Sequence, residues 1–243
     1  MILNIIRMFL QCEYVIPMIY VIMMACIPLT FIINEEMVPY QTITINGETH
    51  LIKDFRYDHP LIEETVTTSL LAVINSFGTF VIIAVTWFGA YVELYKWKSA
   101  VHTLVAYGLA YMIQDFIVAF GKYYIGAFRP NFYDGCGWDN DLGICTVNFE
   151  KGRRSFPSGH SSSAAVVFVY LILSMNDIRT VLRAQNNVPI IIDKLLFLVT
   201  LLSTFVFLFV GASRIHDFWH HPPDVIAGFL IGGLSACACR YTL

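Results

Sequence analysis

The stretch Arg154-Ser-Phe-Pro-Ser-Gly-His-Ser-Ser-Ser-Ala164 decides how this chain is interpreted, because a polar, cation-rich loop becomes a long apolar run within it. The N-terminus of a helix presents unpaired N–H groups and the positive end of the helix dipole, so it favours an anion. Pro157 suits the start of such a helix, and Gly159 lets a ligand approach the backbone closely. His160 stands where it could exchange a proton with that anion. The stretch therefore predicts an anion-binding helix start, although Pro-Ser-Gly is also common in plain loops.

The overall composition is that of a polytopic membrane protein. Of the 243 residues, 57% are hydrophobic and 14% are charged, against about 25% charged residues in soluble domains. The mean hydropathy is +0.64, and the apolar residues come in runs close to the ~20 residues that span a bilayer. The net charge of -3 comes with no basic stripe of the kind that nucleic-acid binding requires. We therefore expect the bilayer as a partner and no nucleic acid.

Six apolar segments predict an all-α fold with six transmembrane helices. We expect one membrane domain over residues 1–243, with a helical-bundle core at about 101–243 after N-terminal spans and a loop at about 1–100. The first segment lacks a small-residue cleavage site, so it is predicted to be a retained span and not a signal peptide. The predicted spans cover about residues 14–33, 65–91, 101–119, 157–175, 190–210 and 222–243.

The distribution of Lys and Arg predicts that both termini lie in the cytosol. Short basic segments, at the two termini and at 92–100 and 176–189, would share that side. The acidic segment 34–64 would lie on the other side, together with the long polar stretch 121–156. That stretch breaks the positive-inside rule, and we attribute its excess of cations to a bound ligand: Lys122, Arg129, Lys151, Arg153 and Arg154.

Three polar clusters are predicted to meet at that membrane face. They occupy residues 122–130, 154–164 and 213–224. A separation of seven residues would place Lys122 and Arg129 on one side of a continuing helix, which the following proline would end. Two spans and a short loop separate the last two clusters, so the chain returns to the same side.

Together these clusters resemble the signature of the type 2 phosphatidic acid phosphatase superfamily. The chain contains Lys-x6-Arg-Pro, then Pro-Ser-Gly-His, then Ser-Arg-x5-His-x3-Asp, in that order over residues 122–224. The six-span layout is similar to the lipid phosphate phosphatase branch, and outside residues 122–224 the likeness is only topological. Every signature position is occupied: Lys122, Arg129, Pro130, Pro157, Ser158, Gly159, His160, Ser213, Arg214, His220 and Asp224.

The resemblance implies a division of labour among these residues. His220 would attack phosphorus and form a phosphohistidine, while Asp224 would hold its imidazole in the productive tautomer. His160 would protonate the leaving alkoxide and then activate water. A phosphate dianion needs several cations and N–H donors around its oxygens, and with these present no metal or cofactor is required. The expected phosphate-binding residues are Lys122, Arg129, Ser158, Gly159 and Arg214.

The resemblance and the membrane setting predict a metal-independent lipid phosphate phosphohydrolase. Its substrates would be phosphatidic acid, lysophosphatidic acid, diacylglycerol pyrophosphate or sphingoid phosphates. Their headgroups would enter sideways at the extracytoplasmic interface, lumenal or extracellular, while the tails stay in the membrane. An isoprenoid or dolichyl (pyro)phosphate phosphatase is the nearest alternative; a soluble phosphate ester as substrate and a vanadate haloperoxidase are more distant. A non-catalytic membrane scaffold or transporter is disfavoured, because no signature residue is missing.

Two features outside the signature leave alternatives open. Cys136 and Cys145 share one polar loop, where a disulfide can form if the loop faces an oxidising compartment. Asp115 lies in the third span, seven positions before Lys122. An acid inside a span is a candidate functional residue, so Asp115 either biases that lysine or makes a helix–helix hydrogen bond.

Two further spacings suggest a metal site and a packing motif. His216 and His220 have the spacing of a zinc-binding pair, but an Asp and two prolines stand where that motif needs a continuous helix with Glu. A zinc site is therefore disfavoured. Gly228-x-x-x-Gly232 in the last span predicts close helix packing.

Overall fold

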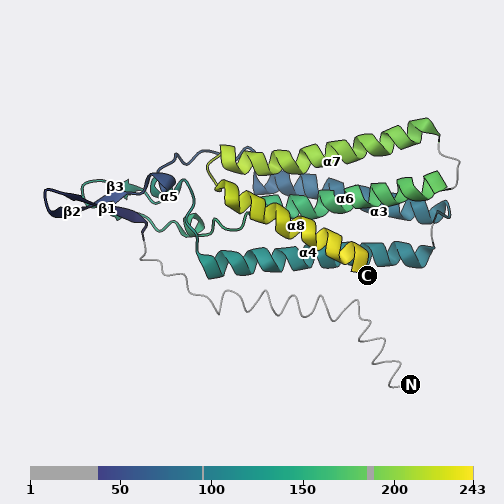
Figure 1. The fold of residues 1–243 in the computed structure, drawn as a ribbon, viewed down its shortest axis with the longest axis horizontal. Helices are drawn as coiled ribbons and strands as arrows, with labels where there is room; N and C mark the ends of the chain where they lie inside the picture. The colour runs from purple at the N-terminus through teal and green to yellow at the C-terminus, as the bar shows by residue number, and fades with distance from the viewer. Residues whose placement is uncertain (1–37, 95, 185–188, 243) are drawn as a thin grey trace, which may run out of the picture.

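The computed structural model describes residues 38–94, 96–184 and 189–242, which form a mostly helical structure. Five long apolar helices run alongside one another, and a smaller group of strands and short helices lies beyond one end of them (Figure 1). Each of the five is long and apolar enough to cross a bilayer. The helices are α3 (Thr68–Tyr91), α4 (Trp97–Ile125), α6 (Gly159–Ala184), α7 (Ile190–His216) and α8 (Pro222–Thr242).

These helices confirm the second to the sixth predicted spans. The first predicted span, at about 14–33, lies outside the described residues. Helix α3 begins after Thr67, whose side chain accepts a hydrogen bond from the backbone N–H of Leu70 (3.2 Å) and so caps the first turn.

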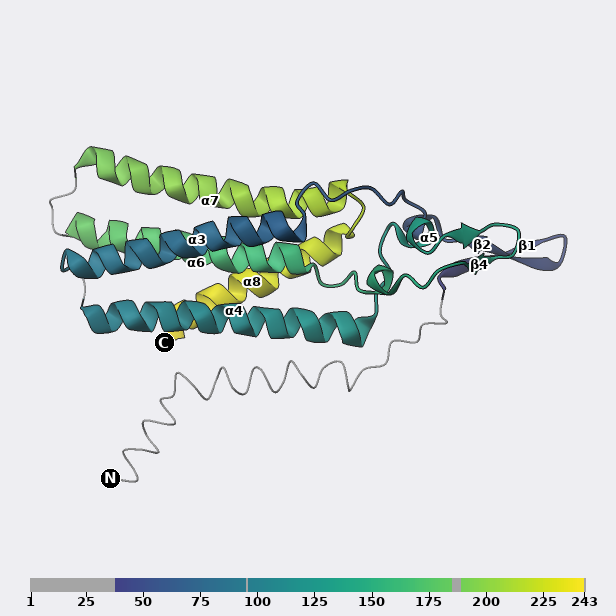
Figure 2. The same ribbon diagram turned by 180° about the vertical axis from the view of Figure 1, so that it is seen from behind.

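Helix α6 is the central helix of the bundle and packs against all four other long helices (Figure 2). Its sequence explains this position, because small and β-branched residues recur along it and let neighbouring helices approach from several sides. Its buried residues are Ser161, Ser162, Ala164, Ala165, Val166, Val167, Phe168, Tyr170, Leu171, Ser174 and Met175.

Two glycines allow α8 to lie directly against the beginning of α6. A Cβ atom at Gly228 would lie 2.5 Å from the backbone oxygen of Ser158, and a Cβ at Gly232 would overlap the backbone oxygen of Ser162. The close packing predicted from Gly228-x-x-x-Gly232 is therefore confirmed. This contact brings the first turns of α6 and α8 together.

Adding one methyl group at Gly232 is expected to destabilise the bundle. In Gly232→Ala the new Cβ would also come within 2.9 Å of Ala165 Cβ and Val166 N. Helix α8 must then shift away from α6, at a cost of about 1–3 kcal/mol. Gly233→Ala is the matched control, because nothing lies within 4 Å of a Cβ there. Thermal unfolding in detergent should show a lower midpoint for Gly232→Ala alone, and equal midpoints would contradict the close approach.

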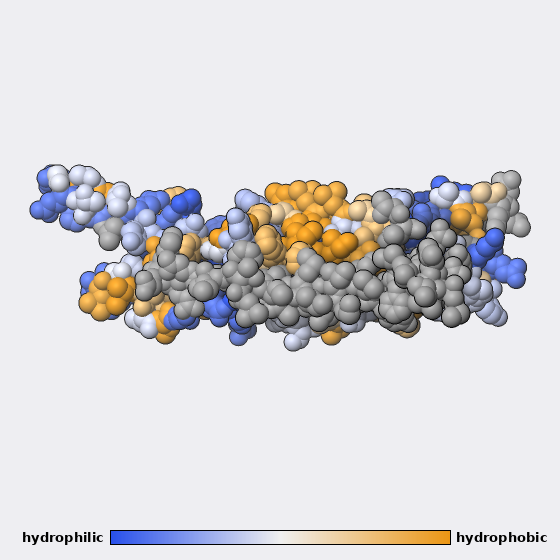
Figure 3. All heavy atoms as spheres, turned by 90° about the horizontal axis from the view of Figure 1, so that it is seen from below, coloured by the Kyte–Doolittle hydropathy of each residue, from blue (hydrophilic) through white to orange (hydrophobic). Residues whose placement is uncertain are grey.

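The outer surface of the bundle carries the apolar belt that a bilayer requires. In Figure 3, hydrophobic residues cover the middle of the bundle where grey atoms do not hide it, and hydrophilic residues gather toward both ends. Large apolar side chains on α3 and α7, among them Phe77, Phe80 and Phe205, are exposed. Their exposure is explained by contact with the hydrocarbon core of a membrane.

Ion pairs connect the helices at the end of the bundle away from the strands. Asp193 near the start of α7 accepts from Arg179 Nε (2.6 Å) and Arg183 Nε (3.0 Å) of α6. Arg240 near the end of α8 donates from Nε to Asp177 of α6 (2.9 Å). These pairs tie both later helices to α6.

The polar segment before α3 contains a β-hairpin. Strands β1 (Tyr40–Ile45) and β2 (Glu48–Lys53) pair antiparallel, and the turn residues Asn46 and Gly47 have φ values of 54° and 87°. Asn-Gly is the preferred pair for such a two-residue turn, because both positions need positive φ. The all-α prediction is corrected here, since alternating Thr-Ile-Thr-Ile followed by Asn-Gly indicates a hairpin.

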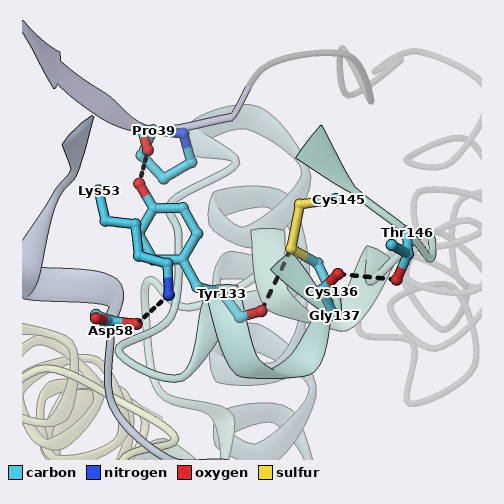
Figure 4. The surroundings of a disulfide bond; sticks show 8 residues. All are labelled: Pro39, Lys53, Asp58, Tyr133, Cys136, Gly137, Cys145 and Thr146. Atoms are coloured by element: carbon cyan, nitrogen blue, oxygen red, sulfur yellow. Dashed lines mark hydrogen bonds and ion pairs between the residues drawn. A yellow bond between two sulfur atoms is a disulfide. The ribbon is translucent and has the colours of Figure 1, made fainter. Parts of the chain in front are cut away.

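This hairpin joins the polar segment after α4 in a small cap. The structure links Cys136 to Cys145 in a disulfide (Figure 4), which resolves the alternative left open by the sequence. Near it, the Tyr133 hydroxyl donates to the carbonyl of Pro39 and so connects the two segments (Figure 4). The remaining short elements of the cap are η1 (Phe55–Tyr57), α5 (Phe132–Gly135), β3 (Trp138–Asp139), β4 (Ile144–Cys145) and η2 (Glu150–Arg153).

Helix α4 ends earlier than predicted. Its last residue is Ile125, because Gly126 adopts φ 61° and its N–H turns back to the carbonyl of Lys122. The prediction that Lys122 and Arg129 share one side of a continuing helix is therefore wrong. Arg129 lies in the loop that follows, where its backbone N–H donates to the carbonyl of Gly152 (2.8 Å).

Two other helix ends also differ from the prediction. Helix α6 begins at Gly159 and not at Pro157. Helix α7 continues to His216, beyond its predicted end. As a result, Ser213 and Arg214 lie in the last turn of a helix and not in a loop.

Candidate active site

The three polar clusters of the sequence meet around one cavity at the cap end of the bundle. The cavity has a volume of about 300 Å³. It lies where α4 and α7 end and α6 begins, so elements far apart in the sequence contribute to it (Figure 1). The predicted convergence is confirmed. Six of the predicted site residues line the cavity: Lys122, Arg129, Gly159, His160, Arg214 and His220.

His220 and Asp224 lie next to each other at the start of α8. The backbone N–H of His220 donates to the carbonyl of Arg214 (3.2 Å) across a tight turn. The His220 side chain is 3% exposed, and its Nδ1 lies 3.5 Å from Asp224 Oδ2, longer than a normal hydrogen bond. Burial lowers the pKa of His220 to about 3, although Asp224 opposes this shift. The imidazole is therefore neutral at physiological pH, with one ring nitrogen free to act as a nucleophile.

Asp224 is held against the beginning of α6 by hydrogen bonds. Its Oδ2 accepts from Ser155 Oγ (2.5 Å) and from the backbone N–H of His221 (3.0 Å). Its carbonyl accepts from the backbone N–H of Ser158 (3.0 Å). Ser155 is fully buried and was not among the predicted residues; its only sequence signal is its place inside the Arg154–Ala164 stretch. These bonds fix the carboxylate that faces His220.

Ser158 and Gly159 have different surroundings although they are adjacent. Gly159 lines the cavity. Ser158 is fully buried, and its Oγ accepts from the Ser161 hydroxyl (2.9 Å) in the first turn of α6. Its backbone N–H donates to the carbonyl of Asp224. The phosphate-binding role of Ser158 stays a prediction. Because its backbone N–H is already bonded, Ser158 could donate to a phosphate only through its hydroxyl.

Five cations line the cavity, and the three among them that are predicted phosphate ligands come from different parts of the chain. Lys122, near the end of α4, donates from Nζ to the carbonyl of Arg154 (3.0 Å). The guanidinium of Arg129 lies 4.8 Å from the ring centroid of Trp219. Burial lowers the pKa of Arg129 to about 10, so this side chain stays charged at neutral pH. Arg214 is 1% exposed. This concentration of buried positive charge around the cavity favours the binding of an anion.

A carboxylate that was not predicted, Glu64, reaches the same cavity. Its Oε2 lies 3.5 Å from Arg214 Nη1 and 4.0 Å from His160 Nε2. His160 Nε2 is buried and has no hydrogen-bond partner among the described residues. One feature of the sequence points to Glu64: it ends the acidic segment 34–64, which is predicted to lie on the same side of the membrane as the cation-rich stretch 121–156.

Hydrogen bonds to Asp217 and Trp219, which follow α7, hold residues 62–65 beside the cavity. Asp217 accepts from the backbone N–H (2.7 Å) and the hydroxyl (2.8 Å) of Thr65. Trp219 Nε1 donates to the carbonyl of Ile62 (3.1 Å). These contacts join residues more than 150 positions apart in the sequence, so local patterns could not predict them.

The structure also places the His216 and His220 pair, which has the spacing of a zinc site, and Asp115 of the third predicted span. His216 is 79% exposed while His220 is buried, and the part of the chain that is described contains no group of three His, Cys, Asp or Glu side chains able to hold a metal ion. Asp115 is not among the residues that line the cavity, and its influence on Lys122 stays a prediction. Its neighbour Gln114 accepts from Ser162 Oγ (2.6 Å) and links α4 to α6.

The fold and the site define a polytopic helical membrane protein with a cavity lined by five cations and two histidines, one of which is paired with a buried carboxylate. The profile of the PAP2 superfamily matches residues 103–243, more than half of the chain. The chain belongs to the PAP2 superfamily.

Curated relatives carry names from the same superfamily. Lipid phosphate phosphatase 1 of Arabidopsis thaliana is 35% identical over 150 residues, which cover 57% of this chain and 43% of the relative. Lipid phosphate phosphatase 2 of the same plant is 28% identical over 200 residues, which cover 78% of this chain and 65% of the relative. The chain therefore spans only part of the length of these relatives. No solved structure matches it.

Proposed function

We propose that this protein is a lipid phosphate phosphohydrolase that works without a metal ion. One arrangement carries the proposal: His220, which is paired with Asp224, and the cations Lys122, Arg129 and Arg214 line one cavity at the end of a bundle of apolar helices. Superfamily membership and the names of two relatives support the same activity.

The cations bind the phosphate group of the lipid. Two guanidinium groups and one ammonium group can contact all of its non-bridging oxygens and stabilise the charge that develops on them. The Gly159 amide, at the N-terminus of α6, adds an N–H donor aligned with the positive end of the helix dipole. The Ser158 hydroxyl completes the set of donors. Together these groups supply the positive charge that a metal ion supplies in other phosphatases.

His220 is the nucleophile. The lone pair of its Nε2 forms a bond to phosphorus while the bond between phosphorus and the ester oxygen breaks. Asp224 holds Nδ1 and stabilises the positive charge that the ring acquires. His160 gives a proton to the departing alkoxide, so the lipid leaves as a neutral alcohol.

Hydrolysis of the phosphohistidine reverses these roles. His160, now neutral, takes a proton from a water molecule, whose oxygen forms a new bond to phosphorus. The bond between phosphorus and Nε2 breaks, His220 regains its lone pair, and inorganic phosphate leaves. Each group returns to its starting protonation state.

The substrates we propose are phosphatidic acid, lysophosphatidic acid, diacylglycerol pyrophosphate and sphingoid phosphates. A cavity at the end of apolar helices receives the headgroup while the tails remain in the bilayer. We place this end on the extracytoplasmic side. The disulfide between Cys136 and Cys145 supports this placement, because disulfides persist in oxidising compartments, and the short basic segments at the other end support it too.

Phosphate release from a panel of lipids tests the proposal. The full chain is purified in detergent and given each lipid phosphate in mixed micelles, with EDTA or with magnesium. We expect the same rate under both conditions, because fixed cations supply the charge. Isoprenoid pyrophosphates in the same panel test the nearest alternative substrate class. A strict need for magnesium, or no phosphate release from any lipid, would overturn the proposal.

A further inference from the structure

Glu64 has an unusual position for a carboxylate, because it enters a cavity lined by cations. Among the described residues that line this cavity, it is the one acid. The position is not incidental, since Asp217 and Trp219 hold residues 62–65 by hydrogen bonds on both sides of Glu64. A fixed carboxylate in this place requires an explanation.

Pairing with the cations is not a sufficient explanation. Glu64 Oε2 lies 3.5 Å from Arg214 Nη1, so it occupies space next to a predicted phosphate ligand. Like charges in a partly buried cavity repel each other strongly. A carboxylate with no other role would only weaken the binding of a phosphate dianion.

His160 supplies the missing role, because an acid in this cavity must keep a proton among many positive charges. Among the described residues, the carboxylate that approaches its imidazole is that of Glu64, whose Oε2 lies 4.0 Å from Nε2. His220, across the cavity, is neutral, and its Asp224 faces that ring. The cationic groups that line the cavity with His160 come from α4, from the loop before α5, from η2 and the residue after it, and from α7: Lys122, Arg129, Lys151, Arg154 and Arg214.

We propose that Glu64 is a positioning residue that holds a proton on His160 until the leaving alkoxide takes it, an inference that rests on the proposed function. When a phosphate oxygen takes over Arg214, the Glu64 carboxylate is released to accept a hydrogen bond from His160 Nε2–H. The ring is thereby kept as the imidazolium, and its other nitrogen delivers a proton to the ester oxygen as the bond to phosphorus breaks. Glu64 itself gains and loses no proton.

Glu64→Gln is expected to change binding and turnover in opposite directions. Inorganic phosphate should bind the full chain about tenfold more tightly, because one repelling charge is gone. Turnover of an alkyl lipid phosphate should fall by about 10- to 100-fold, because the general acid loses its proton more readily. The alkaline limb of kcat should move to lower pH by about one unit, since a carboxylate neighbour raises the pKa of an imidazolium and its removal lowers it.

An aryl phosphate separates this role from a structural one. The phenolate of an acidic phenol leaves without being protonated. In Glu64→Gln, the turnover of an aryl phosphate should therefore fall much less than the turnover of an alkyl phosphate. Glu64→Asp keeps the charge and should recover part of the alkyl activity. Glu63→Gln is the matched control, because Glu63 is exposed and does not line the cavity; it should leave all three measurements unchanged.

Calorimetry with inorganic phosphate needs no turnover, so it distinguishes failure of this inference from failure of the proposed function. Unchanged or weaker phosphate binding in Glu64→Gln would overturn the placement of the carboxylate beside the phosphate. Equal losses for alkyl and aryl phosphates, or an unmoved alkaline limb, would overturn its action through His160.

Discussion

Replacing His220 by alanine is expected to reduce phosphate release from lipid phosphates by at least about 10⁴-fold, because removal of the proposed nucleophile leaves only the contribution of binding and charge stabilisation. The side chain is buried between the ends of α7 and α8, next to Asp224. Burial lowers its pKa to about 3, so the imidazole is neutral in the free protein, as the proposed nucleophile must be. Protonation of His220 should therefore not limit the free enzyme at mildly acidic pH.

The measurement is phosphate release by purified protein, with rapid quenching in alkaline detergent, which preserves phosphohistidine for detection. Wild type should form an acid-labile, base-stable phosphoprotein, and His220→Ala should form none. His216→Ala is the matched control, because this nearby histidine is 79% exposed and does not line the cavity. Activity that survives in His220→Ala would assign the nucleophile to another residue.

Replacing His160 by alanine is expected to stop turnover while sparing phosphate binding. Loss of a general acid and base lowers the turnover of alkyl phosphates by about 10²- to 10⁴-fold. Binding of inorganic phosphate should change little, because Lys122, Arg129 and Arg214 all remain. This result would contrast with loss of a cation, which weakens binding itself.

The choice of substrate separates the two steps in which we propose that His160 acts. With an aryl phosphate, formation of the phosphohistidine needs no acid, whereas its hydrolysis still needs a base for water. His160→Ala should therefore accumulate phosphohistidine on His220 when given an aryl phosphate. Equal loss of both steps with both kinds of substrate, or loss of phosphate binding, would show that His160 has a different role.

Sequence patterns were sufficient for the transmembrane architecture because they depend on local composition. A run of apolar residues long enough to cross a bilayer must bury its own backbone hydrogen bonds, and in lipid a helix is the simplest solution. The last five predicted spans were found for this reason. Topology then placed the ends of alternate spans on one side, which is why the clusters at 122–130, 154–164 and 213–224 could be predicted to converge.

Local backbone geometry was the first point at which pattern reasoning failed. The continuing helix predicted from Lys122 to Arg129 stops at Ile125, because Gly126 adopts a left-handed conformation that glycine permits but does not require. The hairpin at 40–53 was missed although Asn46 and Gly47 mark its turn. The polar composition of segment 34–64 favours a loop, whereas its short alternating Thr-Ile-Thr-Ile stretch favours a strand.

The sequence by itself determined the class of protein, the spans and the signature residues, because hydrophobicity and motif spacing are properties of neighbouring positions. Only the tertiary structure brought Ser155 to Asp224 and residues 62–65 to Asp217 and Trp219. Hydrogen bonds of this kind join side chains that are distant along the chain, and no local pattern records which polar groups will find one another. The place of Glu64 beside His160 and Arg214 was decided in the same way.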